Sequence, residues 1–151
     1  PSRADTSYAY WYLFNFDPNF DAEYEPENWK LAVNNENFRK SIVHAFNRVP
    51  ALATGDAINP TGNISNTITP VSFAVNEGKD YTTYGILPQY VDGDNYDEAK
   101  ALDYKQKAMA ELTTAGAHIP VKMLVCYNPT STSWANECQV VEQNLISYLK
   151  S

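Results

Sequence analysis

Nine residues near the start of the chain, YAYWYLFNF (Tyr8–Phe16), are aromatic or apolar at nearly every position. Successive side chains of a strand point to opposite faces of the sheet. One face would carry Tyr8, Tyr10, Tyr12, Phe14 and Phe16, and the other Ala9, Trp11, Leu13 and Asn15. Because both faces are largely apolar, the pattern predicts a strand covered on both sides, as in an α/β sheet. We expect the Tyr and Phe face in the core, whereas the Trp11 face either joins the core or lines a cleft.

A second run with little polar interruption, VKMLVCY (Val121–Tyr127), predicts another buried strand. Between the two runs, Phe20–Asn34 is acidic and irregular, with at most a short extended piece where Trp29, Leu31 and Val33 alternate. Thr54–Asn95 holds many Gly and Pro residues and has no strong period. A stretch of that length predicts an ordered, meandering excursion packed on the domain rather than a free loop.

Three other stretches have apolar residues at helical spacing. The first is Asn35–Arg48, which Asn34 or Asn35 can cap and which Pro50 is expected to stop. A helical turn at Asp97–Leu102 is followed by a helix over Tyr104–Ala115, with Asp103 as its cap and Gly116 just past its end. The last is Trp134–Lys150, with Cys138 on the core face.

The order of these elements is strand, helix, excursion, helix, strand, helix. This alternation predicts the α/β class (mixed α and β) with a mainly parallel pair of strands. The length of 151 residues fits a single domain. Because the chain starts at Pro1 without a Met or a signal peptide, we expect a mature or excised segment.

The charge balance excludes some partners. Eleven basic and eighteen acidic residues give a net charge of −7. A chain this acidic argues against nucleic acid or an anionic membrane as its partner. No stretch approaches the roughly 18 consecutive apolar residues of a membrane span, so we expect no direct membrane insertion.

The cysteines and histidines form no catalytic or metal motif. Cys126 and Cys138 fit no zinc pattern, and they are either two buried thiols or one bridge. His44 and His118 lie far apart in the sequence, and we expect structural roles for both. We therefore expect no catalytic residue, no metal and no cofactor.

Two acidic stretches also point to structure rather than chemistry. Asp92–Asn95 begins like a calcium loop, but Asp97 and Asp103 stand where an EF-hand needs Gly and Glu. Asp21–Glu27 could supply the carboxylate pair of a glycoside hydrolase, but we interpret it as a solvated loop.

The turn at Asn128–Ser133, NPTSTS, is the best candidate for a ligand contact. It joins the carboxyl end of a predicted strand to the start of a helix, which is where open α/β sheets bind ligands. A helix start offers unpaired N–H groups and the positive end of its dipole. Either Thr132 or Ser133 simply caps the helix, or the turn both caps it and touches a ligand; the sequence leaves both open.

The segments taken together resemble the extracellular solute-binding proteins (family 5 type) of peptide and oligopeptide ABC transporters. In that family a strand ending in Asn leads to a helix of the pattern R-x-A-[IL]-x-x-A-[IL]-[DN]-R, which FRKSIVHAFNR (Phe38–Arg48) resembles. A later helix ends in L-x-x-A-G, similar to Leu112–Gly116, and the next strand ends in Tyr-Asn, as Tyr127-Asn128 does. The resemblance extends over nearly the whole chain.

The resemblance implies part of one lobe of a two-lobed, periplasmic-binding-protein-like (type II) fold. Members of the family are considerably longer, so the 151 residues would be a single-domain fragment of the second lobe. The implied function is binding of oligopeptides or dipeptides for import, without enzymatic activity. A peptide ligand and the membrane permease of the importer are the implied partners. The implied location is extracellular or at the cell surface, with a lipid anchor on a missing N-terminal part.

Site residues follow from the same resemblance. Trp11 and Leu13 would border the peptide cleft, and Asn128, Thr130 and Ser131 would lie on the turn at its side. Leu13 departs from the polar residue that some members carry there. A secreted carbohydrate-binding module that stacks sugars on Tyr and Trp is the alternative, and it predicts an all-β fold. A fragment of a secreted hydrolase using Glu25 or Glu27 is a third possibility.

Overall fold

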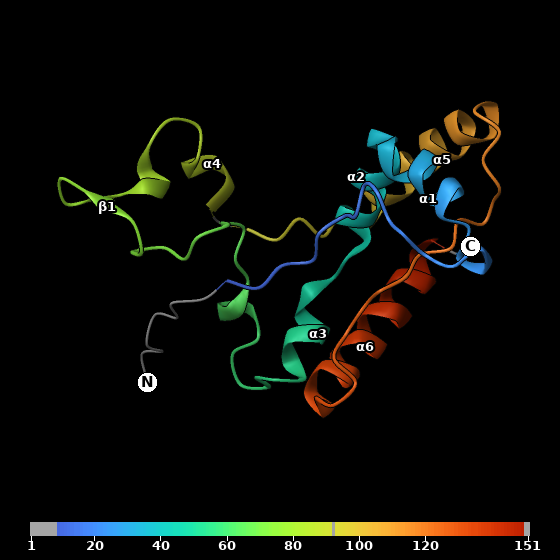
Figure 1. Ribbon diagram of the computed structural model, residues 1–151. Helices are drawn as coiled ribbons and strands as arrows, with labels where there is room; N and C mark the ends of the chain where they lie inside the picture. Colours follow the sequence, from blue (N-terminus) through green and yellow to red (C-terminus); the bar gives the residue numbers. More distant parts are fainter. Residues whose placement is uncertain (1–8, 92, 150–151) are drawn as a thin grey trace. The chain divides into compact units, whose positions relative to one another are not determined.

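The computed structural model describes residues 9–91 and 93–149, and within them the chain is mixed but mostly helical, with 52% helix and 3% strand (Figure 1). The helices are α1 (Pro26–Asn34), α2 (Glu36–Ala45), α3 (Arg48–Ala53), α4 (Pro88–Val91), α5 (Glu98–Thr114) and α6 (Thr132–Leu149). Short 3-10 turns are η1 (Ala22–Tyr24), η2 (Thr61–Asn63) and η3 (Tyr81–Thr83). Strands β1 (Val75–Asn76) and β2 (Lys79–Asp80) form an antiparallel hairpin. None of the helices in these residues is long and apolar enough to span a membrane.

The chain divides into two compact units. One contains the residues up to Leu13 and Gly62–Asp94, and the other contains Phe14–Thr61 and the residues from Asn95 onward. We call them the small unit and the helical unit. The prediction of a single domain stays a prediction.

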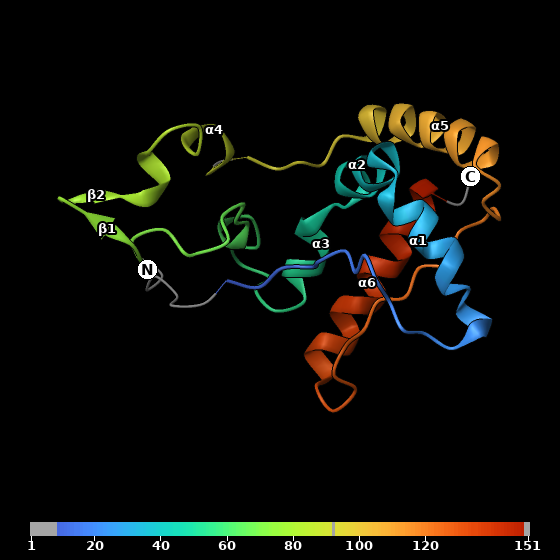
Figure 2. The same ribbon diagram turned by 45° about the horizontal axis from the view of Figure 1, so that its top comes forward.

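The helical unit is built on α2, which packs along α5 (Figure 2). Its larger core cluster joins α2, α3, α5 and α6 through Ile42, Ala45, Ala51, Ala101, Val141 and Leu145. A smaller cluster joins Ala32 of α1 to Ala108 and Leu112 of α5, and Phe38 packs against both clusters. Alanines at these contacts let the helix backbones approach closely, so the core depends on few large side chains.

Polar contacts fix the ends of these helices. Asn35 and Asn37, at the start of α2, donate to the Glu111 carboxylate of α5 at 2.7 and 2.9 Å. These two amides, Asn35 foremost, lower the pKa of Glu111. At the other end of α5, the hydroxyls of Tyr96 and Tyr148 both donate to Oε1 of Glu98, at 2.6 and 2.8 Å. This carboxylate and the neighbouring phenol raise the pKa of Tyr96, and the contact holds the end of α6 against the start of α5.

The small unit has little core. Asp80 organises it by accepting hydrogen bonds from the backbone N–H of Ser72 at 2.6 Å and of Thr82 at 2.9 Å. The threonine is buried, whereas several apolar side chains of the unit are exposed, among them Ile68, Phe73, Val75, Ile86 and Tyr90. The predicted excursion is therefore irregular, with a hairpin and short turns. Its part Gly62–Asp94 forms a unit with the residues up to Leu13, whereas Thr54–Thr61 belongs to the helical unit.

Both predicted long strands are wrong. Within residues 9–16 and 121–127 no backbone ladder forms. A strand needs a partner for its N–H and C=O groups, and an apolar sequence does not supply one. The aromatic face expected in the core is mostly exposed: Tyr10, Tyr12 and Phe16 face solvent, and of the described members Phe14 alone packs against the larger core cluster. Tyr8 lies outside the described residues. The predicted mixture of α and β structure is confirmed in coarse form, as a mixed but mostly helical chain, whereas the mainly parallel pair of strands is wrong, since the sheet in the described residues is an antiparallel pair.

The prediction that Phe20–Asn34 is irregular is also wrong, since Pro26–Asn34 forms α1. Pro26 stands at the first position of the helix, where its missing N–H costs nothing. Trp29, Ala32 and Val33 are buried at helical spacing, while Leu31 is 46% exposed. The alternation of Trp29, Leu31 and Val33 therefore does not mark an extended segment, because Trp29 and Val33 belong to the buried face of a helix.

The other helices are confirmed in position but not in their bounds. Asn35 caps α2 as predicted, because its Oδ1 accepts from the N–H of Phe38 at 2.8 Å. Pro50 does not stop the helix, because α2 already ends at Ala45 and a separate helix, α3, begins at Arg48. Pro50 lies in the first turn of α3, where proline is tolerated. Asp97, rather than Asp103, caps a single helix α5, accepting from the N–H of Lys100 at 3.0 Å. Asp103 instead pairs with Lys107 one turn along the helix, at 2.6 Å.

Candidate functional site

Three of the predicted ligand residues lie together in one exposed turn before α6. Asn128 Oδ1 accepts hydrogen bonds from the backbone N–H of Thr130 at 3.0 Å and from its hydroxyl at 2.7 Å. The N–H of Ser131 donates to the Asn128 carbonyl at 3.1 Å. These contacts shape the turn from within, and the Asn128 side chain is exposed.

The cap of α6 differs from the prediction by one residue. The Ser131 hydroxyl accepts from the N–H of Trp134 at 3.4 Å, so Ser131, and not Thr132 or Ser133, is the capping residue. Ser131 Oγ also lies 3.1 Å from Ser133 Oγ. Ser131 therefore has a structural task, while Asn128 and Thr130 keep the exposed polar surface of the turn.

Trp11 and Leu13 belong to the small unit, whereas the turn belongs to the helical unit. Both side chains are exposed, Trp11 by 51% and Leu13 by 75%. At these exposures neither side chain is part of a core, and single exposed apolar residues are ordinary on a protein surface. Their role beside a ligand stays a prediction.

The segment Val121–Tyr127, which we call the strap, leads into the turn. It runs beside α6 in both views (Figures 1 and 2). Val121, Met123 and Val125 are half-buried, while Lys122, Leu124 and Cys126 are exposed. Burial with a period of two indicates an extended chain with one face on the helices. Met123 packs against the larger core cluster and Val121 against the smaller one.

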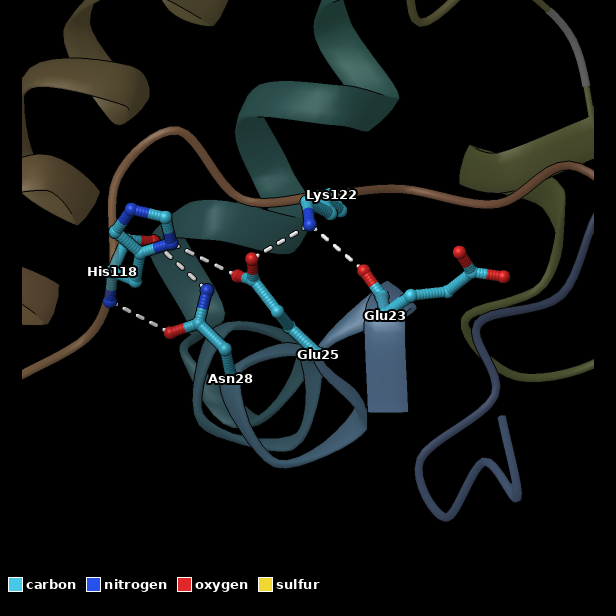
Figure 3. Close-up of polar contacts among 5 residues, drawn as sticks. All are labelled: Glu23, Glu25, Asn28, His118 and Lys122. Atoms are coloured by element: carbon cyan, nitrogen blue, oxygen red, sulfur yellow. Dashed lines mark hydrogen bonds and ion pairs between the residues drawn. The ribbon is translucent and has the colours of Figure 1, made fainter. Parts of the chain in front are cut away.

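A group of polar residues, which we call the clasp, holds the beginning of the strap to the loop before α1 (Figure 3). His118 Nδ1 and Lys122 Nζ lie 2.9 and 2.8 Å from the two carboxylate oxygens of Glu25. The Asn28 side chain pairs with the backbone of His118 in both directions, donating to its carbonyl at 2.8 Å and accepting from its N–H at 2.7 Å. Lys122 also donates to the Glu23 carbonyl at 2.8 Å.

The clasp was not predicted from the sequence. His118 was assigned a structural role for lack of an acidic residue nearby in sequence, and its partner Glu25 is 93 residues away. Glu25 adopts φ 54° and ψ 57°, a left-handed conformation that is uncommon outside glycine. The contacts of its carboxylate with His118 and Lys122 hold Glu25 in this conformation at the residue directly before α1.

Glu25→Gln is expected to remove part of the pH dependence of stability. The hydrogen bond from His118, and then that from Lys122, lower the pKa of Glu25 below its ordinary value of 4.5. A carboxyl whose pKa is lower in the folded chain stabilises it above the unfolded pKa, and this stabilisation is lost as the pH falls through the folded pKa. The gap in urea midpoint between wild type and variant should therefore be widest near neutral pH and close as the pH falls below about 4.5.

Glu23→Gln is the matched control for this experiment. It removes a neighbouring carboxylate, but Glu23 contributes only its main-chain carbonyl to the clasp. Its urea midpoint should follow that of the wild type at every pH. A gap for Glu25→Gln that stays constant from neutral to acid pH would mean that the carboxylate charge has no part in the clasp.

The remaining candidates have structural contacts. His44 stacks on Tyr104, with ring centroids 5.6 Å apart, and its Nδ1 lies 2.6 Å from the Asn95 carbonyl. Cys126 and Cys138 are not bridged to each other: Cys126 is exposed, which corrects its predicted burial, and Cys138 is half-buried. Across residues 9–91 and 93–149 no three His, Cys, Asp or Glu side chains gather in a way that could hold a metal ion.

Comparison with known proteins identifies no relative, since no protein-family model matches the chain and no curated protein matches it significantly.

Proposed function

We propose that the chain forms part of the second lobe of an extracellular solute-binding protein that delivers peptides to an ABC importer. The observation that carries the proposal is the Asn128–Ser131 turn. It places an exposed amide and an exposed hydroxyl directly after an extended apolar segment and directly before a helix. Peptides are bound through their main chain by such groups, which supply both donors and acceptors.

The order of motifs along the chain supports the same proposal. The helix that contains Arg39 and Ala45, the end of α5 at Leu112–Gly116 and the Tyr127-Asn128 pair follow one another as they do in the family that the sequence resembles. In this proposal the residues are walls of the site rather than catalysts, and the intact protein closes two lobes on its ligand by a hinge motion. A cell-surface location and a permease partner belong to the same proposal.

The clasp also supports the proposal, because it helps to position the strap that leads into the Asn128–Ser131 turn. It fixes the start of the strap to the loop before α1, and Ser131 caps α6 directly after the turn. The turn therefore lies between a strap that is held at its start and a helix that is capped. A site that is positioned before the ligand arrives loses less entropy on binding.

Calorimetry with the intact protein that carries this chain tests the proposal. Pooled dipeptides to pentapeptides are expected to bind it, and the 151-residue chain alone to bind them far more weakly, because it contributes only one wall. Asn128→Ala should weaken binding by about three- to tenfold, the effect of one hydrogen bond. Thr113→Ala, an exposed change on α5, is the control and should leave the affinity unchanged.

Two results would contradict the proposal. One is an intact protein that binds none of the peptides, and in particular one that binds sugars instead, as a carbohydrate-binding module would. The other is tight binding of peptides by the 151-residue chain alone, because that would mean the site is complete without a second lobe.

A further inference from the structure

The small unit has an open groove beside its hairpin, with a volume of about 520 Å³. Three aromatic residues contribute to its lining, which consists of Phe73, Ala74, Val75, Asn76, Tyr81 and Tyr84. Phe73 is 66% exposed and Tyr84 is 42% exposed, so both rings offer surface to solvent. None of the lining side chains is a carboxylate, an ammonium or a guanidinium, so the groove itself is aromatic and uncharged at neutral pH.

Hydrogen bonds hold the two tyrosines of the groove. The Tyr84 hydroxyl donates to the Asn76 carbonyl at 3.1 Å, and the Tyr81 hydroxyl donates to the Thr69 carbonyl. The N–H of Tyr81 also donates to the Ala74 carbonyl at 2.9 Å, next to the β1–β2 pair. Both rings are therefore positioned before a ligand arrives, and both hydroxyl hydrogens are already in use. A ligand in the groove meets the rings rather than phenol donors.

The chain does not use the faces of these rings. Elsewhere, lysine and arginine side chains lie over the rings of Phe16 and Tyr104, 5.4–5.5 Å from the ring centroids. Within the described residues, no such cation and no second aromatic ring covers Phe73, Tyr81 or Tyr84. The face of an aromatic ring carries the negative part of its quadrupole and attracts cations. Three such rings around one groove are therefore open to a cation from outside the chain.

Negative charge lies close to the groove. Asp80 belongs to β2, and Glu77 directly follows β1. Hydrogen bonds from the hydroxyl and the N–H of Thr82, and then from the N–H of Ser72, lower the pKa of Asp80, so its carboxylate is ionised at neutral pH. Because these donors already occupy the carboxylate, Asp80 acts on a ligand mainly through its charge. In sequence, Gly62–Asp94 carries four acidic residues and one lysine, so the surroundings also favour a cation.

We propose that this groove is a binding site for quaternary ammonium compounds, with the rings of Phe73, Tyr81 and Tyr84 as an open aromatic cage. A quaternary ammonium has no N–H, so it needs a negative environment and ring faces but no hydrogen-bond acceptors. A primary ammonium has three donors to satisfy, and a sugar has several hydroxyls, whereas Asn76 contributes the one amide side chain of the lining. The groove thus matches a cation without donors better than either of these ligands.

The proposed site is independent of the proposed peptide binding. The groove belongs to the small unit, whereas the Asn128–Ser131 turn belongs to the helical unit. Phe73→Leu is therefore expected to leave peptide binding by the intact protein unchanged, and Asn128→Ala to leave cation binding unchanged. The failure of one site can be distinguished from the failure of the other by these two variants.

NMR titration of the ¹⁵N-labelled 151-residue chain with choline measures both the affinity and the location. Choline is expected to shift the amide signals of residues 73–76 and 81–84, with a dissociation constant on the order of 1 mM. The matched ligand is 3,3-dimethylbutanol, which has the shape of choline without its charge. It should bind at least about fivefold more weakly, because it gains no cation–π attraction.

Substitutions of Phe73 separate cation–π attraction from simple apolar contact. Phe73→Leu keeps an apolar side chain but removes the ring, so it should weaken choline binding by about fivefold, whereas Phe73→Trp should strengthen it. Phe73 is exposed, so neither change is expected to unfold the chain. Tyr90→Leu is the control, since Tyr90 is an exposed aromatic residue of the same unit outside the groove lining. It should leave the affinity for choline unchanged.

Several results would overturn the proposal. They are a chain that shows no saturable binding of choline, equal affinities for choline and 3,3-dimethylbutanol, and an unchanged affinity in Phe73→Leu. Signal shifts confined to residues outside the groove would overturn it as well. A groove that binds neutral sugars in preference to choline would be a stacking platform for uncharged ligands, which also contradicts the proposal.

Discussion

Replacing Trp29 by alanine is expected to lower the free energy of unfolding by about 3–5 kcal/mol, the usual cost of truncating a buried aromatic side chain. Trp29 is only 6% exposed, and its ring meets that of Phe38 edge-on, with centroids 6.0 Å apart. Its indole N–H donates to the Asn15 carbonyl at 2.7 Å. The substitution would leave a cavity beside α2 and would release the segment before η1 from α1.

Two further variants separate the contributions in a urea titration. Trp29→Phe keeps most of the ring but removes the indole N–H, so it should cost about 1 kcal/mol for the lost hydrogen bond plus a smaller packing term. Leu31→Ala, two residues along the same helix, changes a side chain that is 46% exposed and should cost less than 1 kcal/mol. A loss below 1 kcal/mol for Trp29→Ala would show that α1 is not part of the cooperative core.

Trp29 also shows where sequence patterns were ambiguous. The spacing of Trp29, Leu31 and Val33 fits an alternating strand, while Trp29, Ala32 and Val33 fit a helical stripe equally well. Ala32 distinguishes the helix from the strand. In a helix it lies on the same face as Trp29 and Val33, whereas in a strand it would lie on the opposite face. Ala32 is fully buried, as the helix requires. Pro26 at the first helical position was the local signal that could have identified α1.

The strands failed for a different reason. An apolar run specifies that a segment can be buried, but the hydrogen bonds of a strand come from another part of the chain. Val121–Tyr127 keeps the extended form and the alternating burial that the pattern predicted, yet it lacks a ladder. The alternating burial, which depends on neighbouring residues, was predicted correctly, whereas the pairing with another strand was not.

The candidate site divides in the same way. The turn before α6 could be predicted because capping residues and a helical pattern follow one another directly in the sequence. The observed cap, Ser131, directly precedes the predicted candidates Thr132 and Ser133. The clasp could not be predicted, since Glu25 and His118 are brought together by the packing of α1 against the rest of the helical unit. No spacing rule links residues so far apart in a single sequence.

Replacing Leu145 by alanine is expected to lower the free energy of unfolding by about 2–5 kcal/mol. The helical spacing of Trp134, Cys138, Val141, Leu145 and Tyr148 predicted one apolar face for α6, but the structure buries only part of it. Val141 and Leu145 are buried in the larger core cluster, whereas Trp134 is exposed. Leu145 is thus the larger of the two buried side chains that attach α6, and with it the candidate turn, to α2 and α5.

Ile146 supplies the matched control at the next position of the same helix. It is an aliphatic residue of the same size as Leu145, but it is 43% exposed, compared with 6% for Leu145. Ile146→Ala should therefore cost less than 1 kcal/mol, because little apolar surface is removed from the core. Equal losses for the two variants in urea titrations would mean that α6 packs through a different face. A loss confined to Leu145→Ala would confirm that the face carrying Val141 and Leu145 attaches the helix, with the turn at its start, to the core.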